Sequence, residues 1–238
     1  MPRFKGFKMR IELLDEVSST NEYIKNYLGG GEDVIVCARR QSGGKGTKGR
    51  SFLSGEGGVY FSALAFYSGI PAAQAFRVMT HAAVAVCRTA EKFGAVPEIK
   101  WPNDIHCGGR KLCGILIENK IEDGELKNSI VGIGLNVCND LAALNGIAVN
   151  LSDCAGREIS VDDARDALIE NWYRASSFDD YLSRVKFLGR EITVTEGAQT
   201  YPAVALRILP DGRLEVQCGA EVRALSSAEI SIKFGDKA

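Results

Sequence analysis

A glycine-rich loop loaded with cations sets the strongest limit on how this chain can fold. Residues 41–50 read QSGGKGTKGR, and residues 44–49 match the GxGxxG pattern of dinucleotide-binding folds. In those folds the loop opens a helix, whereas here it lies between two predicted strands, at 33–38 and 59–66. No Gly-Lys pair in the loop is followed by Ser or Thr, which excludes a Walker loop as well. The sequence therefore predicts a strand–loop–strand unit rather than a Rossmann domain.

The composition of this loop also predicts an anion site. Glycine lets backbone N–H groups approach phosphate oxygens closely, and Lys45, Lys48 and Arg50 add positive charge. A loop of this kind can close over a reactive intermediate and exclude water. The alternative is a basic turn that is simply solvated, and the loop taken alone does not decide between the two.

A second polar segment, KWPND at residues 100–104, is followed closely by Lys111. Its proline favours extended backbone just before Asn103 and Asp104. Asp104 can accept N–H donors or help to hold a metal, while Lys100 and Lys111 offer charges for a carboxylate and a phosphate. Taken alone, the segment also fits a capped turn with surface lysines. Together with the glycine loop, it favours a ligand site.

The hydroxyls of Ser19 and Thr20 allow two interpretations. Ser19 and Glu22 have the spacing of a capping box, which predicts that a helix begins here. The same hydroxyls could instead hydrogen-bond a small polar head group such as a urea, and spacing does not separate the two. Residues 132–136 (GIGLN) end a predicted buried strand, either as a packing feature or as part of a site lining.

The overall composition limits the classes of partner. The 238 residues carry a formal net charge of −1, with 45% apolar and 25% charged residues, so neither nucleic acid nor an anionic membrane is indicated. No apolar run approaches the ~18–20 residues that cross a bilayer, and no signal peptide is recognisable, which predicts a cytoplasmic protein. The seven scattered cysteines fit free thiols in a reducing compartment. The two histidines, His81 and His106, offer little to a Ser-His-Asp arrangement.

The remaining pattern predicts an α+β fold in two parts. In the first part we expect a mixed sheet with flanking helices, built from strands at 9–17, 33–38, 59–66, 112–119 and 129–137 and helices at 18–28, 71–93, 160–172 and up to 187. After Leu188, short strands at 191–195, 201–209, 214–218 and 229–233 predict a small β-barrel or sheet. We therefore divide the chain into a domain of residues 1–187 and a domain of residues 188–238.

The order of these motifs resembles that of the biotin protein ligases. The triplet STN at 19–21 comes first, followed by Gln41 with the glycine loop, residues 57–62 (GGVYFS), KWPND, residues 110–118 (RKLCGILIE) and GIGLN. The segment after Leu188 resembles the small SH3-like C-terminal domain of that family. The resemblance covers nearly the whole chain and implies the family's catalytic fold, which is similar to that of class II synthetases.

By this resemblance, the chain activates biotin with ATP and passes it to a lysine of a carrier protein. ATP chemistry implies Mg²⁺, near Asp104 or Asn103. The implied catalytic residues are Lys111, Lys100 and Asp104, with Asp104 also as metal ligand. The implied biotin contacts are Ser19, Thr20, Asn21, Gln41, Lys45, Gly46, Thr47, Lys111 and Gly114. The implied ATP contacts are Gly44, Lys45, Lys48, Arg50, Trp101, Asn103, Lys111 and Asn136.

The chain departs from the family pattern in two places. The family loop usually reads GRGRxGR, and here Lys45 keeps the charge but loses the bidentate fork, while Thr47 loses the charge. Retention of the adenylate is therefore expected to depend more on Lys48 and Arg50, or to be weaker. Near the C-terminus, residues 227–229 read SAE where the family often has glycine before the glutamate.

The resemblance also implies partners: biotin and the biotin carboxyl carrier domain of a carboxylase, with a homodimer left open. Some family members carry an N-terminal DNA-binding domain, but here the catalytic pattern begins within about ten residues of Met1, so we expect a short form with no DNA-binding role. The nearest alternative is a lipoate–protein ligase, which shares the fold and the adenylate strategy. A third hypothesis is a non-catalytic nucleotide-binding module, and the presence of Lys100 and Lys111 disfavours it.

Overall fold

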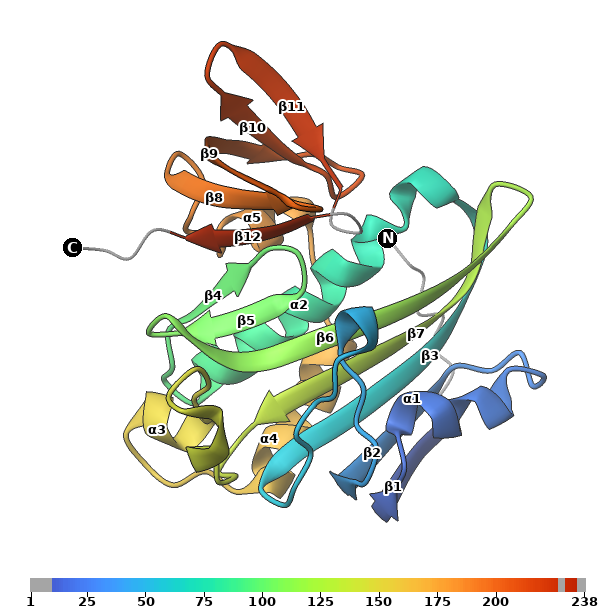
Figure 1. Ribbon diagram of the computed structural model, residues 1–238. Helices are drawn as coiled ribbons and strands as arrows, with labels where there is room; N and C mark the ends of the chain where they lie inside the picture. Colours follow the sequence, from blue (N-terminus) through green and yellow to red (C-terminus); the bar gives the residue numbers. More distant parts are fainter. Residues whose placement is uncertain (1–9, 227–229, 235–238) are drawn as a thin grey trace.

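A seven-stranded mixed sheet forms the centre of the molecule (Figure 1). The computed structural model describes residues 10–226 and 230–234, and the side chains of Lys48 and of residues 230–234 lie outside that description. The strand order is β1-β2-β3-β7-β6-β5-β4, with β1 and β2 parallel and every other neighbouring pair antiparallel. The strands are β1 Arg10–Val17, β2 Val34–Gln41, β3 Gly58–Pro71, β4 Pro97–Lys100, β5 Asp104–Cys107, β6 Arg110–Glu122 and β7 Glu125–Asn136.

The longer helices cover one face of this sheet, and the glycine loop covers the other (Figure 1). Helix α2 is rich in alanine and valine, and its buried side packs on β6, β7 and α4. The α-helices are α1 Thr20–Tyr23, α2 Phe76–Lys92, α3 Leu151–Ala155, α4 Val161–Trp172 and α5 Phe178–Leu182, and the 3-10 turns are η1 Ile24–Tyr27, η2 Thr47–Gly49, η3 Ala72–Gln74 and η4 Ala142–Leu144.

The alternation of side chains along the central strands explains why the two faces differ. Phe61 and Ala63 of β3, with Val131 and Ile133 of β7, point into the large core beneath the helices. The residues between them face the glycine loop, and they are small or polar in the middle of the sheet. Farther along this second face, Ile24 of η1 packs on the sheet and forms a smaller apolar cluster with Val34, Val36, Leu64 and Ile130. The second face is therefore left open for a ligand only in its central part.

A five-stranded antiparallel sheet follows α5, in the region after Leu188 where the sequence predicts short strands. Its order is β11-β10-β9-β8-β12. The strands are β8 Glu191–Glu196, β9 Gln199–Ile208, β10 Leu214–Cys218, β11 Glu221–Leu225 and β12 Ile230–Phe234. The turn between β9 and β10 meets the first sheet, because Trp101 Nε1 donates to the Gly212 carbonyl at 2.9 Å. The predicted α+β class, with a second small β-sheet at the C-terminal end, is confirmed.

Three local predictions need correction. The capping box of Ser19 and Glu22 does not form: the Ser19 side chain makes no capping bond, and the Thr20 N–H is instead satisfied by the Gln41 side chain at 2.8 Å. Helix α2 begins at Phe76 rather than at residue 71, because β3 continues as far as Pro71. Strand β11 was not predicted, although its sequence EVRAL alternates polar and apolar residues from Glu221 to Ala224. The helix predicted at 160–172 is confirmed as α4, and the Ser160 hydroxyl caps its start by accepting from the Asp163 N–H.

Among the described residues, no helix is both long and apolar enough to span a bilayer.

Candidate functional site

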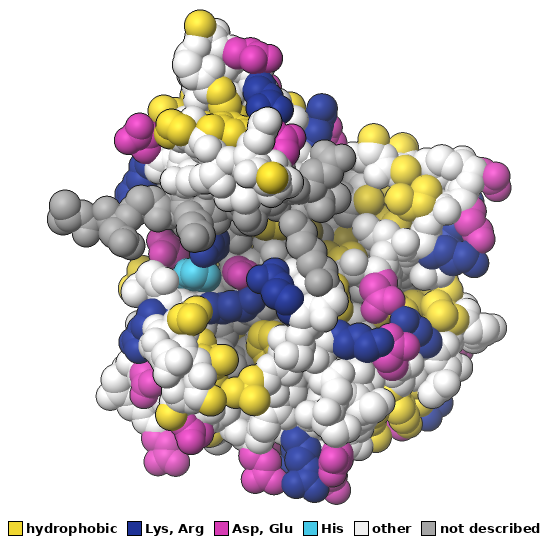
Figure 2. Space-filling model, in the orientation of Figure 1, with side chains coloured by type: hydrophobic (Ala, Val, Ile, Leu, Met, Phe, Trp, Pro, Cys, Tyr) yellow, Lys and Arg dark blue, Asp and Glu magenta, His cyan; other side chains and the backbone are white. Residues whose placement is uncertain are grey.

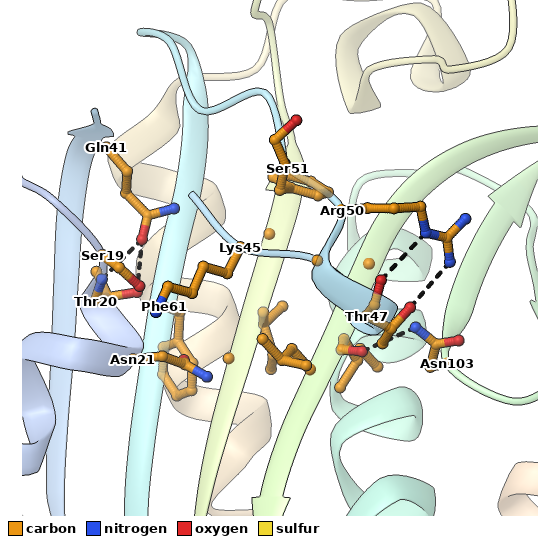
Figure 3. Close-up of a pocket in the computed structure, with 18 of the residues that line it drawn as sticks. Ser19, Thr20, Asn21, Gln41, Lys45, Thr47, Arg50, Ser51, Phe61 and Asn103 are labelled. Atoms are coloured by element: carbon orange, nitrogen blue, oxygen red, sulfur yellow. Dashed lines mark hydrogen bonds between the residues drawn. The ribbon is translucent and has the colours of Figure 1, made fainter. Parts of the chain in front are cut away.

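A pocket opens on the loop-covered face of the central sheet, where segments distant in sequence converge (Figure 3). Helix α1 forms one side, the glycine loop crosses above, and β6 and β7 form the floor. In Figure 2, Lys and Arg side chains gather along a hollow on this face, with acidic side chains among them. The lining consists of Ser19, Thr20, Asn21, Gln41, Lys45, Gly46, Thr47, Arg50, Ser51, Phe52, Phe61, Asn103, Lys111, Gly114, Ile115, Leu116, Gly132, Ile133 and Gly134.

Glycines on neighbouring strands make the floor of this pocket. Gly114 of β6 and Gly134 of β7 are register partners, so the two positions without a Cβ lie side by side. A Cβ at Gly134 would meet the Phe52 ring at 2.5 Å, and a Cβ at Gly132 would meet Asn21 Oδ1 at 2.3 Å. The absence of side chains therefore lets Phe52 and Asn21 lie directly against the sheet. The GIGLN pattern serves the site as well as the packing.

One end of the pocket carries a neutral hydrogen-bond network. The Ser62 hydroxyl lies within hydrogen-bond distance of Thr20 Oγ1 (2.8 Å) and Asn21 Oδ1 (2.6 Å), and it is fully buried. Gln41 Oε1 accepts from the Thr20 hydroxyl at 3.1 Å, and its amide nitrogen donates to Ser54 Oγ at 2.9 Å. Because each member is held by another, the amide and hydroxyl groups are fixed in place before a ligand arrives.

The glycine loop folds back on itself above the pocket. Its Gly46 N–H donates to the Arg50 carbonyl at 2.7 Å, which closes the short turn η2. The Arg50 guanidinium donates to the carbonyl and to the hydroxyl of Thr47. Lys45 reaches in the other direction, to Glu22 Oε1 on α1 at 2.7 Å. The loop thus brings two cationic side chains to the lining, as its composition predicts.

The KWPND segment brings a lysine and a carboxylate together at the other end. Asn103 is bound to β6 twice, since its Nδ2 donates to the Ile115 carbonyl at 3.0 Å and its own carbonyl accepts the Ile115 N–H at 2.9 Å. This anchoring places Asp104 Oδ1 2.8 Å from Lys111 Nζ. The Lys111 ammonium also lies 6.0 Å from the centre of the Phe52 ring. A positive charge is therefore held at the junction of the loop and the sheet.

The surroundings of this lysine oppose any further positive charge. His106, opposite Lys111 in the β5–β6 register, has its pKa lowered to about 4, by burial first and then by Lys100. The imidazole is consequently neutral near neutral pH. Cys113, one residue before Gly114, is buried, and burial raises the pKa of its thiol far above the ordinary range. Neither group supplies a charged nucleophile to the site.

Comparison with known sequence families shows to which family the chain belongs. The sequence model of the biotin/lipoate A/B protein ligase family matches residues 13–136, slightly more than half of the chain. The chain belongs to this family. The match runs from β1 to the end of β7 and so includes the elements that build the pocket.

Among curated relatives, the chain is 30% identical over 220 residues to the bifunctional ligase/repressor BirA of Bacillus subtilis. That alignment covers 84% of this chain and 66% of the relative, so the chain spans just under two thirds of that protein's length. It is 27% identical over 236 residues to a biotin–[acetyl-CoA-carboxylase] ligase of Paracoccus denitrificans, covering 92% of this chain and 98% of the relative. Among solved structures, the biotin protein ligase from Aquifex aeolicus in complex with biotin and ATP shares the fold with a TM-score of 0.72, at 24% identity, over 96% of this chain and 100% of that one.

Most residues singled out from the sequence meet in this one pocket. The lining includes Ser19, Thr20, Asn21, Gln41, Lys45, Gly46, Thr47, Arg50, Asn103, Lys111 and Gly114. The lining does not include Gly44, Lys100, Trp101, Asp104 or Asn136, although Asp104 contacts Lys111. Trp101 is buried and turns to Gly212, and Asn136 is buried and donates to the Val149 carbonyl at 3.3 Å. The side chain of Lys48 and residues 227–229 lie outside the described part of the chain.

Sequence reasoning gave no site role to Phe52, and none to Ser62 beyond its place in the motif GGVYFS, while the role of the GIGLN glycines was left open. Ser62 sits in an apolar strand and looks like an ordinary small core residue until strand pairing brings it beside α1. Phe52 follows the glycine loop directly, and its distance from Gly134 along the chain conceals their contact. GIGLN gave the available signal, because its alternate glycines at 132 and 134 mark a strand face without side-chain bulk. YFSALA gave none, because the neighbours of Ser62 on its own face are Tyr60 and Leu64.

Proposed function

We propose that this chain is an ATP-dependent biotin protein ligase, which forms biotinyl-5′-AMP and transfers biotin to a specific lysine of a biotin carboxyl carrier protein. The observation that carries the proposal is one pocket with two chemically different ends on a shared glycine floor. The neutral end combines hydroxyl and amide groups, and the other end holds lysine and arginine side chains. Biotin has a neutral urea at one end and a carboxylate at the other, in the same order.

The neutral end suits a urea better than the dithiolane ring of lipoate. A urea has two N–H donors and one carbonyl acceptor, and the network of Thr20, Asn21, Gln41 and Ser62 offers oxygen acceptors together with hydroxyl and amide donors. A dithiolane offers no comparable donor, so binding it would leave these buried polar groups without new partners. This supports biotin over lipoate within the biotin/lipoate family.

In the first step, a biotin carboxylate oxygen attacks the α-phosphorus of ATP, and the bond from that phosphorus to the bridging oxygen breaks to release pyrophosphate. Two anions must meet, so neutralisation and positioning are the main obstacles. Lys111 lies at the cationic end with its ammonium held by Asp104, and Arg50 of the loop lies across the same pocket. We assign to Lys111 the charge that draws the carboxylate and the α-phosphate together.

In the second step, the amine of the carrier lysine attacks the carbonyl carbon of the mixed anhydride. An amide forms, the bond to the phosphate oxygen breaks, and AMP leaves as the amine loses its proton. The glycine loop above the pocket would shield the anhydride from water until the carrier arrives. Its folded-back turn, closed by Gly46 and Arg50, fits that role.

Magnesium would enter with the nucleotide. Asp104 presents a buried carboxylate oxygen that, among the described residues, has no hydrogen bond of ordinary geometry and lies 2.8 Å from Lys111 Nζ. No group of three or more His, Cys, Asp or Glu side chains in the described chain is arranged to hold an ion by itself. This fits an ion carried mainly by ATP phosphates, with Asp104 and Asn103 as the protein groups near it. When bound, Mg²⁺ would neutralise developing charge on the leaving pyrophosphate.

Other assignments from the sequence stay predictions. The first group concerns the site: the contact roles of the individual residues named above, including Lys100, Trp101 and Asn136. The second concerns the whole chain: the domain division between residues 187 and 188, the carrier domain as partner, a cytoplasmic location, a homodimer, and the lack of a DNA-binding role.

Isotope exchange between pyrophosphate and ATP tests the adenylation step directly. We expect exchange that requires biotin and Mg²⁺ and is weak or absent with lipoate. Exchange that responds to lipoate and ignores biotin would move the chain to the lipoate branch of the family. No exchange with either acid, under conditions where the chain binds ATP, would contradict the ligase assignment.

A further inference from the structure

Lys45 spans the pocket and ends on an acidic residue of α1. Figure 3 shows its side chain running from the glycine loop toward the turn that carries Thr20 and Asn21. Its ammonium lies 2.7 Å from Glu22 Oε1. Glu22 follows Asn21 directly in the chain, so the cation is held beside the neutral end rather than at the Lys111 end.

Glu22 is in turn fixed by a second cation. Lys25 Nζ lies 3.0 Å from Glu22 and 2.9 Å from Glu118 Oε2 on β6. The other oxygen of Glu118 accepts from Asn21 Nδ2 at 3.2 Å. Hydrogen bonds to Lys45 and then Lys25 lower the pKa of Glu22, which keeps it ionised. A chain of contacts thus joins the loop cation to the Asn21 amide.

Among the side chains of loop residues 45–50 that the structure describes, Lys45 is the one that forms a hydrogen bond to an element across the pocket. The other hydrogen bonds described for residues 45–50 join the loop to itself: Gly46 to Arg50, and Arg50 to Thr47. Residues 43 and 44 are tied more firmly, since the Gly43 N–H donates to the Ser18 carbonyl at 2.8 Å. In the described part of the loop, the contact of Lys45 with Glu22 is therefore the link that ties its middle to α1.

We propose that Glu22 is a positioning residue, which holds Lys45 across the pocket and so slows the escape of bound ligand. The proposal rests on the proposed function and deepens it, because it assigns ligand retention to an ion pair that includes the lysine present at a family arginine position. Both side chains are partly exposed, at 54% for Lys45 and 39% for Glu22. Exposed pairs are weak and screened by salt, so removing the charge should speed release about two- to fivefold.

The test measures release of radiolabelled biotin, and of a non-hydrolysable biotinyl-adenylate analogue, from the wild type and from Glu22→Gln. Glu22→Gln keeps the shape and removes the charge. We expect faster release at low salt, a flatter salt dependence, an unchanged melting temperature and little change in the adenylation rate at saturating substrates. In a Lys45→Gln background, Glu22→Gln should add nothing, since the effect acts through Lys45.

The Lys92–Glu170 pair gives a matched control, with an equally close contact of 2.8 Å between two exposed side chains on α2 and α4. Glu170→Gln should leave release unchanged. Equal release from wild type and Glu22→Gln, or slower release from the variant, would overturn this proposal while leaving the ligase assignment intact. A wild type that binds no biotin would overturn both.

Discussion

The two ends of the pocket hold their polar groups in opposite ways. At the neutral end, Thr20, Asn21 and Ser62 are at most 4% exposed and bind one another through uncharged hydrogen bonds. At the charged end, the Lys111 side chain is 31% exposed and is paired with the Asp104 carboxylate. One end is a buried network whose hydrogen bonds are already formed, whereas the other is an ion pair open to water.

This difference separates recognition from chemistry. A buried, fully bonded network is rigid and rejects ligands that do not match its donors and acceptors. A partly exposed ion pair can exchange partners at little cost, so Asp104 can give up Lys111 to an incoming carboxylate or phosphate. We therefore expect substitutions at the neutral end to change which ligand binds, and substitutions at the charged end to change how fast it reacts.

Lys111→Ala should have the largest effect. Removing one preorganised cation from the reacting anions is expected to lower the adenylation rate by about 10²–10³. Biotin binding without ATP should change much less, because the neutral end is intact. Single-turnover adenylation and equilibrium binding, measured on the same preparation, check both halves. A variant that loses binding and rate in equal proportion would remove the distinction between the two ends.

Gly132→Ala should damage the neutral end selectively. The new Cβ would stand 2.3 Å from Asn21 Oδ1 and displace an amide that Ser62 and Glu118 now hold. Losing this arrangement should weaken biotin binding about ten- to a hundredfold. Adenylation at saturating biotin should fall far less.

Gly29→Ala is the matched control for that substitution, because Gly29 has open space around it and an ordinary backbone conformation. Calorimetric titration with biotin compares the two variants. Equal affinity in Gly132→Ala and wild type would show that Asn21 is not part of the recognising network.

Only part of this site could be predicted from the sequence. The glycine loop, KWPND and Lys111 could be identified because their polar residues lie close together in the sequence. The structure brings these segments to one pocket. The pairing of β3 with β7, which sets Phe61 opposite Ile133, and the meeting of Ser62 with Thr20 join residues far apart in the sequence, and no local pattern encodes them. The prediction for the Ser19 cap was wrong for the same reason: Gln41, a distant residue, supplies the acceptor.

Ser62→Ala should reduce stability as well as binding. The substitution removes the hydroxyl that lies between Thr20 Oγ1 and Asn21 Oδ1 and leaves at least one of these buried oxygens without its donor, a loss of about 1–3 kcal/mol in the free energy of unfolding. Lys111→Ala, at a partly exposed ion pair, should lose less than about 1 kcal/mol. Urea unfolding of both proteins tests this contrast. Equal losses would mean that the neutral network is no more rigid than the charged end.

The smallest effect concerns pH at the charged end. His106 has a pKa of about 4 in the folded chain, lowered by burial and then by Lys100. Because the unfolded chain binds this proton more readily, stability falls as the pH drops from about 6.5 towards about 4, with a contribution of about 1 kcal/mol after allowance for partial exposure. Lys100→Met should raise the pKa of His106 and reduce this loss. Titration of the imidazole by NMR checks the direction, and an unchanged pKa would refute the contribution of Lys100.

Transfer of biotin to a carrier lysine tests the central claim most directly. Purified chain, a biotin carboxyl carrier domain, ATP, Mg²⁺ and biotin are combined, and labelled carrier is detected with streptavidin, beside Lys111→Ala and a carrier whose target lysine is replaced by arginine. The account predicts labelling that requires ATP, falls steeply in Lys111→Ala and disappears with the substituted carrier. Undiminished labelling by Lys111→Ala, or transfer of lipoate in place of biotin, would contradict it.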